Sequence, residues 1–266
     1  MSTLALGAHV EQTDPIAEAQ ARKAPLVQFF LGDPQGYKKP VVRYEGGAQA
    51  LRAAAQEAGV DLYVHAPYLV NVATLNNRIR IPSRKLLQQH LDAATEIGAK
   101  GLIVHGGHVA GPDEEEKGFD NWRKAIESLT ITDTPVLIEN TAGGDHAMAR
   151  HLDRIARVWE AISSAEGSDK VGFCLDTCHA WAGGIELGDV VDRVREITGR
   201  IDLVHANDSR DAAGSGADRH ANLGAGQLPP DELADVVRGA GAPVVVETPG
   251  GASEHLADLD WLREHL

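Results

Sequence analysis

The sequence predicts an α/β protein folded as a single (β/α)8, or TIM, barrel with a metal site at the carboxyl ends of its strands. Eight short apolar runs alternate with helical patterns along 266 residues, which is the number expected for such a barrel. No linker or low-complexity tract divides the chain, so one domain is expected over residues 1–266. Nearly every run also ends in an imidazole or a carboxylate.

The expected strands are short runs rich in apolar and β-branched residues, each followed by an amphipathic stretch. They cover residues 4–10, 25–31, 61–68, 101–107, 135–141, 171–178, 201–208 and 243–249. The segment 83–98 has the clearest helical pattern, and Ser83, which follows Pro82, is expected to cap its start. The apolar face of this helix is formed by Leu86, Leu87, Leu91, Ala94 and Ile97.

The composition is typical of a soluble globular protein, with 43% hydrophobic and 24% charged residues. No apolar run approaches the roughly 18 residues of a membrane span. The start, MSTLALGAHVEQTDP, lacks the features of a signal peptide, so a cytoplasmic protein is expected. The net charge of −14 argues, taken alone, against a nucleic-acid partner. Binding depends on local potential, however, and bound dications would offset several carboxylates.

Histidines and carboxylates at the strand ends form the candidate site, because TIM barrels build their active sites at that face. The runs end in, or are closely followed by, His9, His65, His105, Glu139, Asp176, His179, His205, Asp218, His220 and Glu247. One strand-end histidine is more often a packing residue, but the joint pattern favours a site for Zn²⁺, Mn²⁺ or Fe²⁺. Five other histidines are expected in or near helices at the surface: His90, His146, His151, His255 and His265.

Both cysteines lie in the stretch FCLDTCHAWAGG, residues 173–184. Their spacing is not the C-x-x-C of a redox pair or a zinc ribbon, and two cysteines make no disulfide framework. In a strand through this stretch, Cys174 shares a face with Asp176, one layer deeper in the barrel. We therefore interpret Asp176 and His179 as ligands and the cysteines as packing residues, Cys178 being nearer the rim.

Four segments resemble the endonuclease IV family of zinc-dependent apurinic/apyrimidinic endonucleases. They are HAPYLVNVA (65–73), IENTAGG (138–144), FCLDTCHAWAGG (173–184) and HANDSRDAAGSGADRHANLGAGQL (205–228). The resemblance implies three zinc ions, with Mn²⁺ as an alternative at a weaker position. It implies one zinc on His65, His105 and Glu139, a second on Glu139, Asp176, His205 and Glu247, and a third on His179, Asp218 and His220.

The resemblance also implies the partner and the reaction. A monomer would hydrolyse the phosphodiester 5′ to an abasic nucleotide in double-stranded DNA, leave a 3′-hydroxyl, and remove 3′-blocking groups. Glu139, bridging two zinc ions, would position the hydroxide between them and so serve as the catalytic residue. Tyr68 and Leu69 would fill the stack left by the missing base.

Further contacts to DNA are expected from basic residues on or near the strand-end loops. They are Lys38, Lys39, Arg78, Arg80, Arg210 and Arg219. Four polar residues near the expected ligands either support the site or simply pack: His9, His108, Asn140 and Asn207.

Two other functions fit parts of the pattern. Glu139, Asp176, His205 and Glu247 alone resemble the single-metal site of sugar isomerases and epimerases with this barrel. That interpretation leaves five residues of the pattern without a role, and metal stoichiometry would separate the two enzymes. A non-catalytic binder of damaged DNA with structural zinc is the third possibility, although structural zinc sites are usually closed and rich in thiolates.

Overall fold

The computed structural model describes residues 4–266 and confirms the TIM barrel. Eight parallel strands close in the order β1-β10-β7-β6-β5-β4-β3-β2. Their bounds are β1 (Leu6–His9), β2 (Leu26–Phe30), β3 (Asp61–His65), β4 (Gly101–His105), β5 (Val136–Glu139), β6 (Val171–Asp176), β7 (Leu203–His205) and β10 (Val244–Val246). The first three residues of the predicted domain lie outside the described residues.

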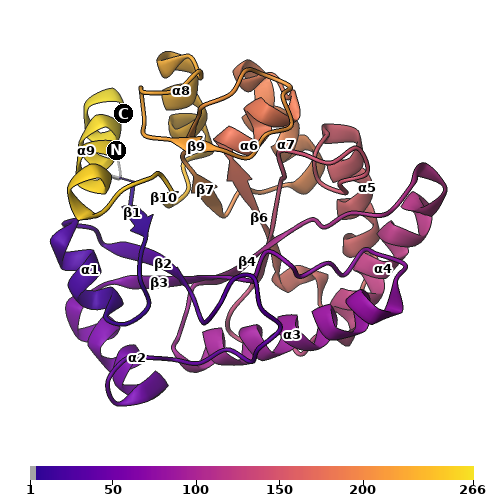
Figure 1. The fold of residues 1–266 in the computed structure, drawn as a ribbon, viewed down its shortest axis with the longest axis horizontal. Helices are drawn as coiled ribbons and strands as arrows, with labels where there is room; N and C mark the ends of the chain where they lie inside the picture. The colour runs from indigo at the N-terminus through magenta and orange to yellow at the C-terminus, as the bar shows by residue number, and fades with distance from the viewer. Residues whose placement is uncertain (1–3) are drawn as a thin grey trace.

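The helices surround the strands, as Figure 1 shows. They are α1 (Pro15–Ala21), α2 (Gly47–Ala58), α3 (Asn77–Glu96), α4 (Glu115–Ser128), α5 (Leu152–Ser163), α6 (Thr177–Gly183), α7 (Val190–Thr198), α8 (Pro230–Ala240) and α9 (Ala252–His265). Three short 3₁₀ turns are η1 (Pro112–Glu114), η2 (Ser168–Lys170) and η3 (Leu187–Asp189). Within residues 4–266, no helix combines the length and apolar character needed to cross a membrane.

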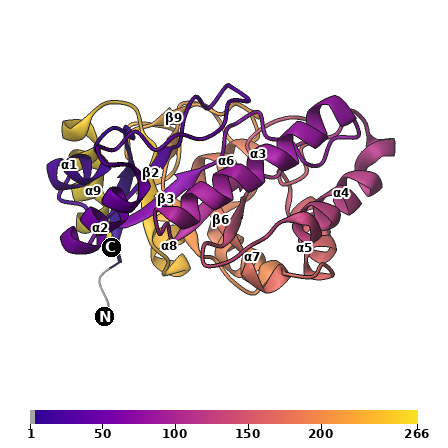
Figure 2. The same ribbon diagram turned by 90° about the horizontal axis from the view of Figure 1, so that it is seen from below.

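A short antiparallel hairpin interrupts the βα alternation after β7. It pairs β8 (Asp208–Ser209) with β9 (His220–Ala221). In Figure 2 this hairpin and the loop after β2 lie along the upper side of the molecule. The hairpin carries Asp218 and His220 to the same end of the barrel as the strand ends.

The barrel interior is packed by side chains from neighbouring strands. Seven of them form one cluster: Leu26, Tyr63, Ile103, Leu137, Cys174, Leu203 and Val245. The strand register then sets the layer above this cluster. Cα of His105 pairs with Glu139, and Cα of Asp176 pairs with His205, so these four side chains reach the rim at matched heights.

Helix α3 begins earlier than predicted. Asn76 caps it by accepting the Arg78 backbone N–H, so Pro82 lies inside the helix rather than before it. The prediction that Ser83 caps this helix is wrong. Ser83 is buried, and its hydroxyl accepts the backbone N–H of Asn71 instead. Proline is typical of the first turn of a helix, but Pro82 lies beyond the first turn of α3, which is why the predicted start is too late.

Two histidines expected at the surface are buried. His90 in α3 and His255 in α9 are 2% and 5% exposed. His255 accepts from Arg22 Nε at 3.0 Å, a contact between residues 233 positions apart. Such a contact cannot be read from local pattern, which is why the surface prediction was wrong for this residue. Residues 177 and 178, expected to extend strand six, instead open α6.

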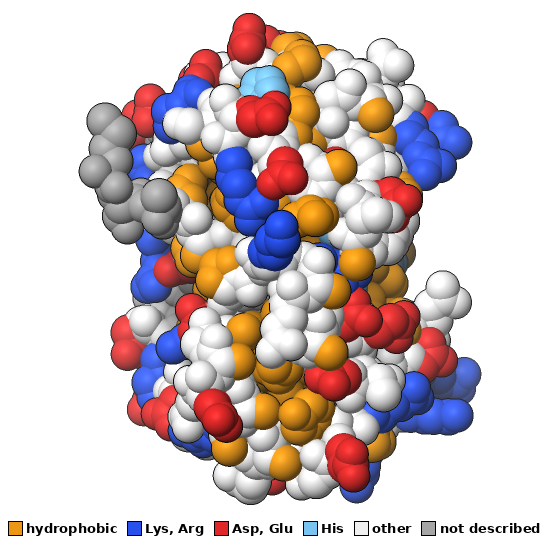
Figure 3. All heavy atoms as spheres, turned by 90° about the vertical axis from the view of Figure 1, so that its left-hand side faces the viewer, with side chains coloured by type: hydrophobic (Ala, Val, Ile, Leu, Met, Phe, Trp, Pro, Cys, Tyr) orange, Lys and Arg blue, Asp and Glu red, His pale blue; other side chains and the backbone are white. Residues whose placement is uncertain are grey.

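Acidic and basic side chains are mixed on one side of the molecule. Figure 3 shows the side of the molecule that carries α1, α2 and α9, where Asp and Glu are interspersed with Lys and Arg. The net charge of −14 is therefore not expressed as a single acidic field on this side.

Candidate metal centre

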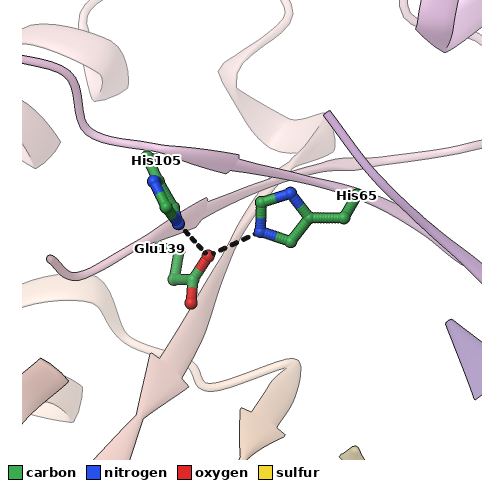
Figure 4. A group of neighbouring side chains, drawn as sticks. All are labelled: His65, His105 and Glu139. Atoms are coloured by element: carbon green, nitrogen blue, oxygen red, sulfur yellow. Dashed lines mark hydrogen bonds and ion pairs between the residues drawn. The ribbon is translucent and has the colours of Figure 1, made fainter. Parts of the chain in front are cut away.

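Glu139 lies at the centre of the candidate site, fully buried at the end of β5. Its Oε2 atom is 3.1 Å from Nε2 of His65 on β3 and 3.2 Å from Nε2 of His105 on β4. Figure 4 shows the two imidazoles converging on this one oxygen. Three neighbouring strands thus supply one group of three potential ligands.

The other oxygen of Glu139 faces a second group. Oε1 lies 2.9 Å from Nδ1 of His205, and the same nitrogen is 3.3 Å from Oε2 of Glu247. Asp176 completes the group, with Oδ2 3.9 Å from Nδ1 of His205. One ligand atom from each of these four residues lies within 4.8 Å of the others.

A third group is built by α6 and the β8–β9 hairpin. Oδ1 of Asp218 lies 3.2 Å from Nε2 of both His179 and His220. Asp176 Oδ1 caps α6 by accepting the His179 backbone N–H at 2.6 Å, which fixes the start of the helix that carries His179. The Asp218 side chain is 51% exposed, whereas His179 is nearly buried, so this group opens toward solvent.

The imidazoles are oriented by hydrogen bonds through their other ring nitrogens. The four bonds are His65 Nδ1 to Ala66 O (2.7 Å), His179 Nδ1 to Asn140 O (2.9 Å), His220 Nδ1 to Glu247 O (3.2 Å) and His205 Nε2 to Gln28 Oε1 (2.8 Å). Each acceptor is an oxygen, so in the neutral ring the proton sits on that side. The nitrogen facing the carboxylates is then free to bind a metal, which is the usual arrangement of metal-binding histidines.

The donor set fits zinc or a similar ion. Nε2 of His179 and of His220 are buried, yet neither has a hydrogen-bond partner of normal geometry among residues 4–266. A buried nitrogen without a partner costs free energy, and a metal ion bound there would remove that cost.

The carboxylates and imidazoles shift one another's pKa. Burial alone would raise the pKa of Glu139, but the charge of His205 and its neighbouring imidazoles outweighs burial and lowers it well below its usual range. Burial would lower the pKa of His220, but the adjacent carboxylate of Asp218 raises it to about 9. The buried carboxylates therefore require nearby positive charge, which a divalent cation supplies more fully than protons do.

Asn207 and Asn140 both contact Asp176. Nδ2 of Asn207 donates to Asp176 Oδ2 at 2.7 Å, and its Oδ1 accepts the Glu247 backbone N–H at 2.8 Å. The Asn140 side chain instead pairs with the Asp176 backbone, donating to its carbonyl at 2.9 Å and accepting its N–H at 2.8 Å. Both amides thus hold an expected ligand in place.

His9 and His108 have different surroundings. His9 Nδ1 lies 3.3 Å from Glu247 Oε1, and burial lowers the pKa of this imidazole. His108 is exposed and lines the cavity beside the site, with its backbone carbonyl accepting from Asn71 Nδ2 at 2.9 Å. Only His9 reaches an expected ligand.

Both cysteines are buried. Cys174 lies in the interior cluster below the rim, and Cys178 lies in α6. Burial raises the pKa of each thiol to about 12, so both are protonated at neutral pH. The sulfur atoms nevertheless lie near two of the groups, Cys174 with Glu139 and His205, and Cys178 with Asp218 and His220, so their role as packing residues stays a prediction.

Gln28 is a site residue that the sequence pattern did not single out. It is fully buried in β2, and its amide contacts His205, Glu247 and His9. The available signal was a glutamine inside the apolar run PLVQFFL, where a polar side chain must find partners in the barrel interior.

A cavity of about 650 Å³ adjoins the site, and a second of about 430 Å³ opens beside it. Tyr68 lines both; it is 51% exposed, and its ring centre lies 5.6 Å from those of His65 and His105. Leu69 is partly buried and lines the larger cavity.

The basic residues predicted to contact DNA differ in whether their side chains are already hydrogen-bonded or ion-paired within the protein. Arg80 donates to Thr74 O and Asn77, and Arg219 is paired with Asp211. Arg210 donates through Nε to the His220 carbonyl at 3.0 Å and lines the smaller cavity. The remaining three are exposed: Lys38, Lys39 and Arg78.

Comparison with known proteins agrees with this geometry. The sequence model of a family described as xylose isomerase-like TIM barrel matches residues 16–265. A protein from Mycobacterium marinum named probable endonuclease 4 is 57% identical over 261 residues, with 98% of each chain covered. Among solved structures, endonuclease IV from Thermus thermophilus has a TM-score of 0.84 and 26% identity over 98% of both chains. A D-tagatose 3-epimerase-like protein has a TM-score of 0.77 at 17% identity, with 98% of this chain and 97% of that one covered, a likeness of fold alone. The chain therefore belongs to the endonuclease IV family of xylose isomerase-like TIM barrels.

Proposed function

We propose that this protein is a DNA-repair hydrolase that cleaves the phosphodiester 5′ to abasic sites, leaves a 3′-hydroxyl, and removes 3′-blocking groups with the help of three zinc ions. The observation that carries the proposal is the position of Glu139, whose two oxygens face two different ligand groups beside a third. The names of the Mycobacterium marinum and Thermus thermophilus relatives support DNA as the substrate.

Nine side chains would hold the zinc ions in three groups, Glu139 being shared by two. The groups are His65, His105 and Glu139; Glu139, Asp176, His205 and Glu247; and His179, Asp218 and His220. When bound, the ions would supply Lewis acidity, offsetting phosphate charge and lowering the pKa of water to about 7.

The protein's own contribution is to fix these groups in place. Because Glu139 is buried and its two oxygens point to opposite groups, its backbone position sets the spacing between the first two groups. The third group, with Asp218 half-exposed, lies on the solvent side, where a phosphate can approach from the cavity. Arg210, which lines the same cavity, adds positive charge for that phosphate.

Tyr68 and Leu69 suit recognition of an abasic site. Both line the cavity beside the site, and the Tyr68 ring is exposed. A sugar without a base can leave the helix at lower cost than a normal nucleotide, because little stacking is lost. An aromatic ring at the mouth of the site can then stack on the neighbouring bases.

The proposal is tested by nicking of a duplex that contains one tetrahydrofuran abasic analogue, with the fragment ends identified. The analogue cannot undergo β-elimination, so a cut must be hydrolytic. We expect one cut 5′ to the lesion that leaves a 3′-hydroxyl, and no cut in the undamaged duplex. A folded, zinc-loaded protein that leaves the analogue intact would contradict the proposal. Activity on a 3′-phosphoglycolate end tests the second part of it.

A one-metal sugar enzyme is the alternative suggested by the epimerase-like fold. Five residues with converging side chains would have no role in it: His65, His105, His179, Asp218 and His220. Three zinc ions per chain, counted by mass spectrometry of the metal, favour the nuclease, and one favours the epimerase.

A zinc-stabilised binder of damaged DNA would differ in its response to Glu139→Gln. A binder should keep its affinity for the lesion and have no turnover to lose. A nuclease should lose turnover by about 100-fold or more, because even changes to residues that only support a metal ligand typically cost 10- to 100-fold.

A further inference from the structure

Gln28 connects two ligands of one metal group through a single buried amide. We infer that Gln28 is a positioning residue that fixes the ring of His205 and the carboxylate of Glu247 for the metal they share. This inference rests on the proposed metal-dependent function.

The two ends of the Gln28 amide, its NH₂ group and its carbonyl oxygen, have different partners. Nε2 of Gln28 donates to Oε1 of Glu247 at 2.6 Å and lies 3.0 Å from Nδ1 of His9. Oε1 of Gln28 lies 2.8 Å from Nε2 of His205. Gln28 is fully buried, so no water competes for these positions.

The opposite orientation of the amide is excluded by chemistry. Turned around, the carbonyl oxygen would face the Glu247 carboxylate, and the NH₂ group would face His205. A carboxylate accepts and cannot donate, so the first of these contacts would be repulsive. The Glu247 carboxylate therefore determines which end of Gln28 faces His205.

This orientation in turn determines where His205 carries its proton. The Gln28 carbonyl oxygen can only accept, so Nε2 of His205 must donate to it. Nδ1 is then unprotonated in the neutral ring, and it is the atom 2.9 Å from Glu139 Oε1. Gln28 thus selects the ring nitrogen that faces the metal group.

His205 differs from His65, His179 and His220 in the kind of group that accepts a hydrogen bond from its ring. The rings of His65, His179 and His220 are held by backbone carbonyls, which side-chain substitution cannot remove. The ring of His205 is held by a side chain, so its support can be deleted without touching any ligand.

Removing the Gln28 amide should weaken the binding of only one of the three metal ions. Gln28→Met keeps a similar volume but removes both the donor and the acceptor. We expect zinc bound by the group of Glu139, Asp176, His205 and Glu247 to be about 10- to 100-fold weaker, the usual loss when such a support is removed. Within residues 4–266, the side chain of Gln28 forms no hydrogen bond to the third group, which consists of His179, Asp218 and His220. That group should therefore keep its affinity for zinc.

The experiment compares wild type, Gln28→Met, Gln28→Leu and the control Gln12→Leu. Gln12 is also buried near the rim, but it makes no hydrogen bond to the nine ligand residues within residues 4–266. Zinc is titrated against a chromophoric chelator, and the occupancy of each position is measured by anomalous scattering in crystals of partly chelated protein. Circular dichroism of each variant establishes that it is folded.

We expect three tight zinc ions in wild type and in Gln12→Leu, with one of the three selectively weakened in both Gln28 variants. Unchanged affinities in folded Gln28→Met would overturn the inference while leaving the proposed function standing. Equal weakening of all three ions would also overturn it, because that is the mark of a general loss of structure. A wild-type protein that binds no zinc would instead refute the proposed function.

Discussion

Asn207 joins the ends of β6 and β10, because its Nδ2 donates to Asp176 Oδ2 at 2.7 Å while its Oδ1 accepts the backbone N–H of Glu247 at 2.8 Å. All three residues lie in or near the second metal group. Replacing Asn207 by Asp keeps the size of the side chain but sets a carboxylate against the carboxylate of Asp176. We expect zinc affinity to fall about 10- to 100-fold and the metal-free protein to lose about 1–3 kcal/mol of unfolding free energy.

Denaturant unfolding with a chelator present measures the unfolding free energy of the metal-free protein. Competition with a chelator measures the zinc affinity. Asn76→Asp is the matched control, since Asp is as good as Asn at the N-cap that Asn76 occupies. Equal stability of Asn207→Asp and wild type would show that the hydrogen bond from Asn207 to Asp176 contributes little.

The metal-free protein should lose stability as pH rises from 6.5 to 9. The pKa of His220 is raised to about 9, and that of His179 is also raised, against the effect of burial, by nearby carboxylates. An imidazole whose pKa is raised by folding stabilises the folded state fully below its ordinary pKa of about 6.5. That contribution disappears as pH rises through the folded-state pKa.

Melting temperatures with chelator and with zinc, measured from pH 6.5 to 9, check this expectation. The zinc-loaded protein should lack this decline, because the metal replaces the protons, and it should instead lose its metal below about pH 6 as the imidazoles protonate. Parallel curves for the two forms would mean that the imidazoles carry no protons without metal.

The residues at the strand ends could be predicted because parallel strands of a barrel bring their carboxyl ends to one rim. His105 and Glu139, for example, are far apart in sequence but paired in register. Supports such as Gln28 could not be predicted with equal ease, since their roles depend on which strand lies opposite. The same holds for the Arg22–His255 contact and for the pairing that holds Arg219.

Asp208 should be essential for the loop that follows the β8–β9 hairpin. Its buried carboxylate accepts four backbone N–H groups, from Ser209, Gly224, Gly226 and Leu228, at 2.7 to 3.1 Å. Asp208→Ala would leave these donors unpaired, and we expect a loss of about 2–4 kcal/mol in unfolding free energy. The third metal group should weaken as well, because the same hairpin carries Asp218 and His220.

Urea unfolding and zinc titration of Asp208→Ala test both effects, with exposed Asp231→Ala as the control. Asp208→Asn should be intermediate, since it retains one acceptor oxygen. A zinc affinity at the third group equal to that of wild type would show that the hairpin is held by its other contacts.

Tyr68 should contribute to binding of the lesion but not to binding of metal. Tyr68 is 51% exposed at the mouth of the site, and its hydroxyl is not among the proposed metal ligands. Tyr68→Ala should weaken binding to abasic DNA by about 1–3 kcal/mol, the usual contribution of one stacked aromatic ring. Tyr68→Phe, which keeps the ring, should bind like wild type.

Fluorescence anisotropy with abasic and intact duplexes provides the measurement, and zinc content provides the control. Loss of zinc from Tyr68→Ala would assign the ring a structural role beside His65 and His105 instead. An equal loss of affinity for intact DNA would show that the ring does not distinguish abasic DNA from intact DNA.

Arg219 should raise the affinity for DNA partly by neutralising the negative charge of Asp211. The two form a two-pronged ion pair in which Arg219 Nε donates to Asp211 Oδ2 at 2.8 Å, on the rim of the smaller cavity. Arg219→Gln removes one positive charge and also leaves the negative charge of Asp211 unpaired beside the smaller cavity. We expect a larger loss of affinity than for Lys38→Gln, an exposed lysine with no masking role assigned to it.

The double variant Arg219→Gln/Asp211→Asn separates masking from direct contact. If masking contributes, removing the freed carboxylate should recover part of the affinity lost in Arg219→Gln. If Arg219 acts only by contacting phosphate, the double variant should bind as weakly as the single one. The salt dependence of binding gives an independent measure, because each lost phosphate contact should reduce the slope of log K against log salt by roughly 1.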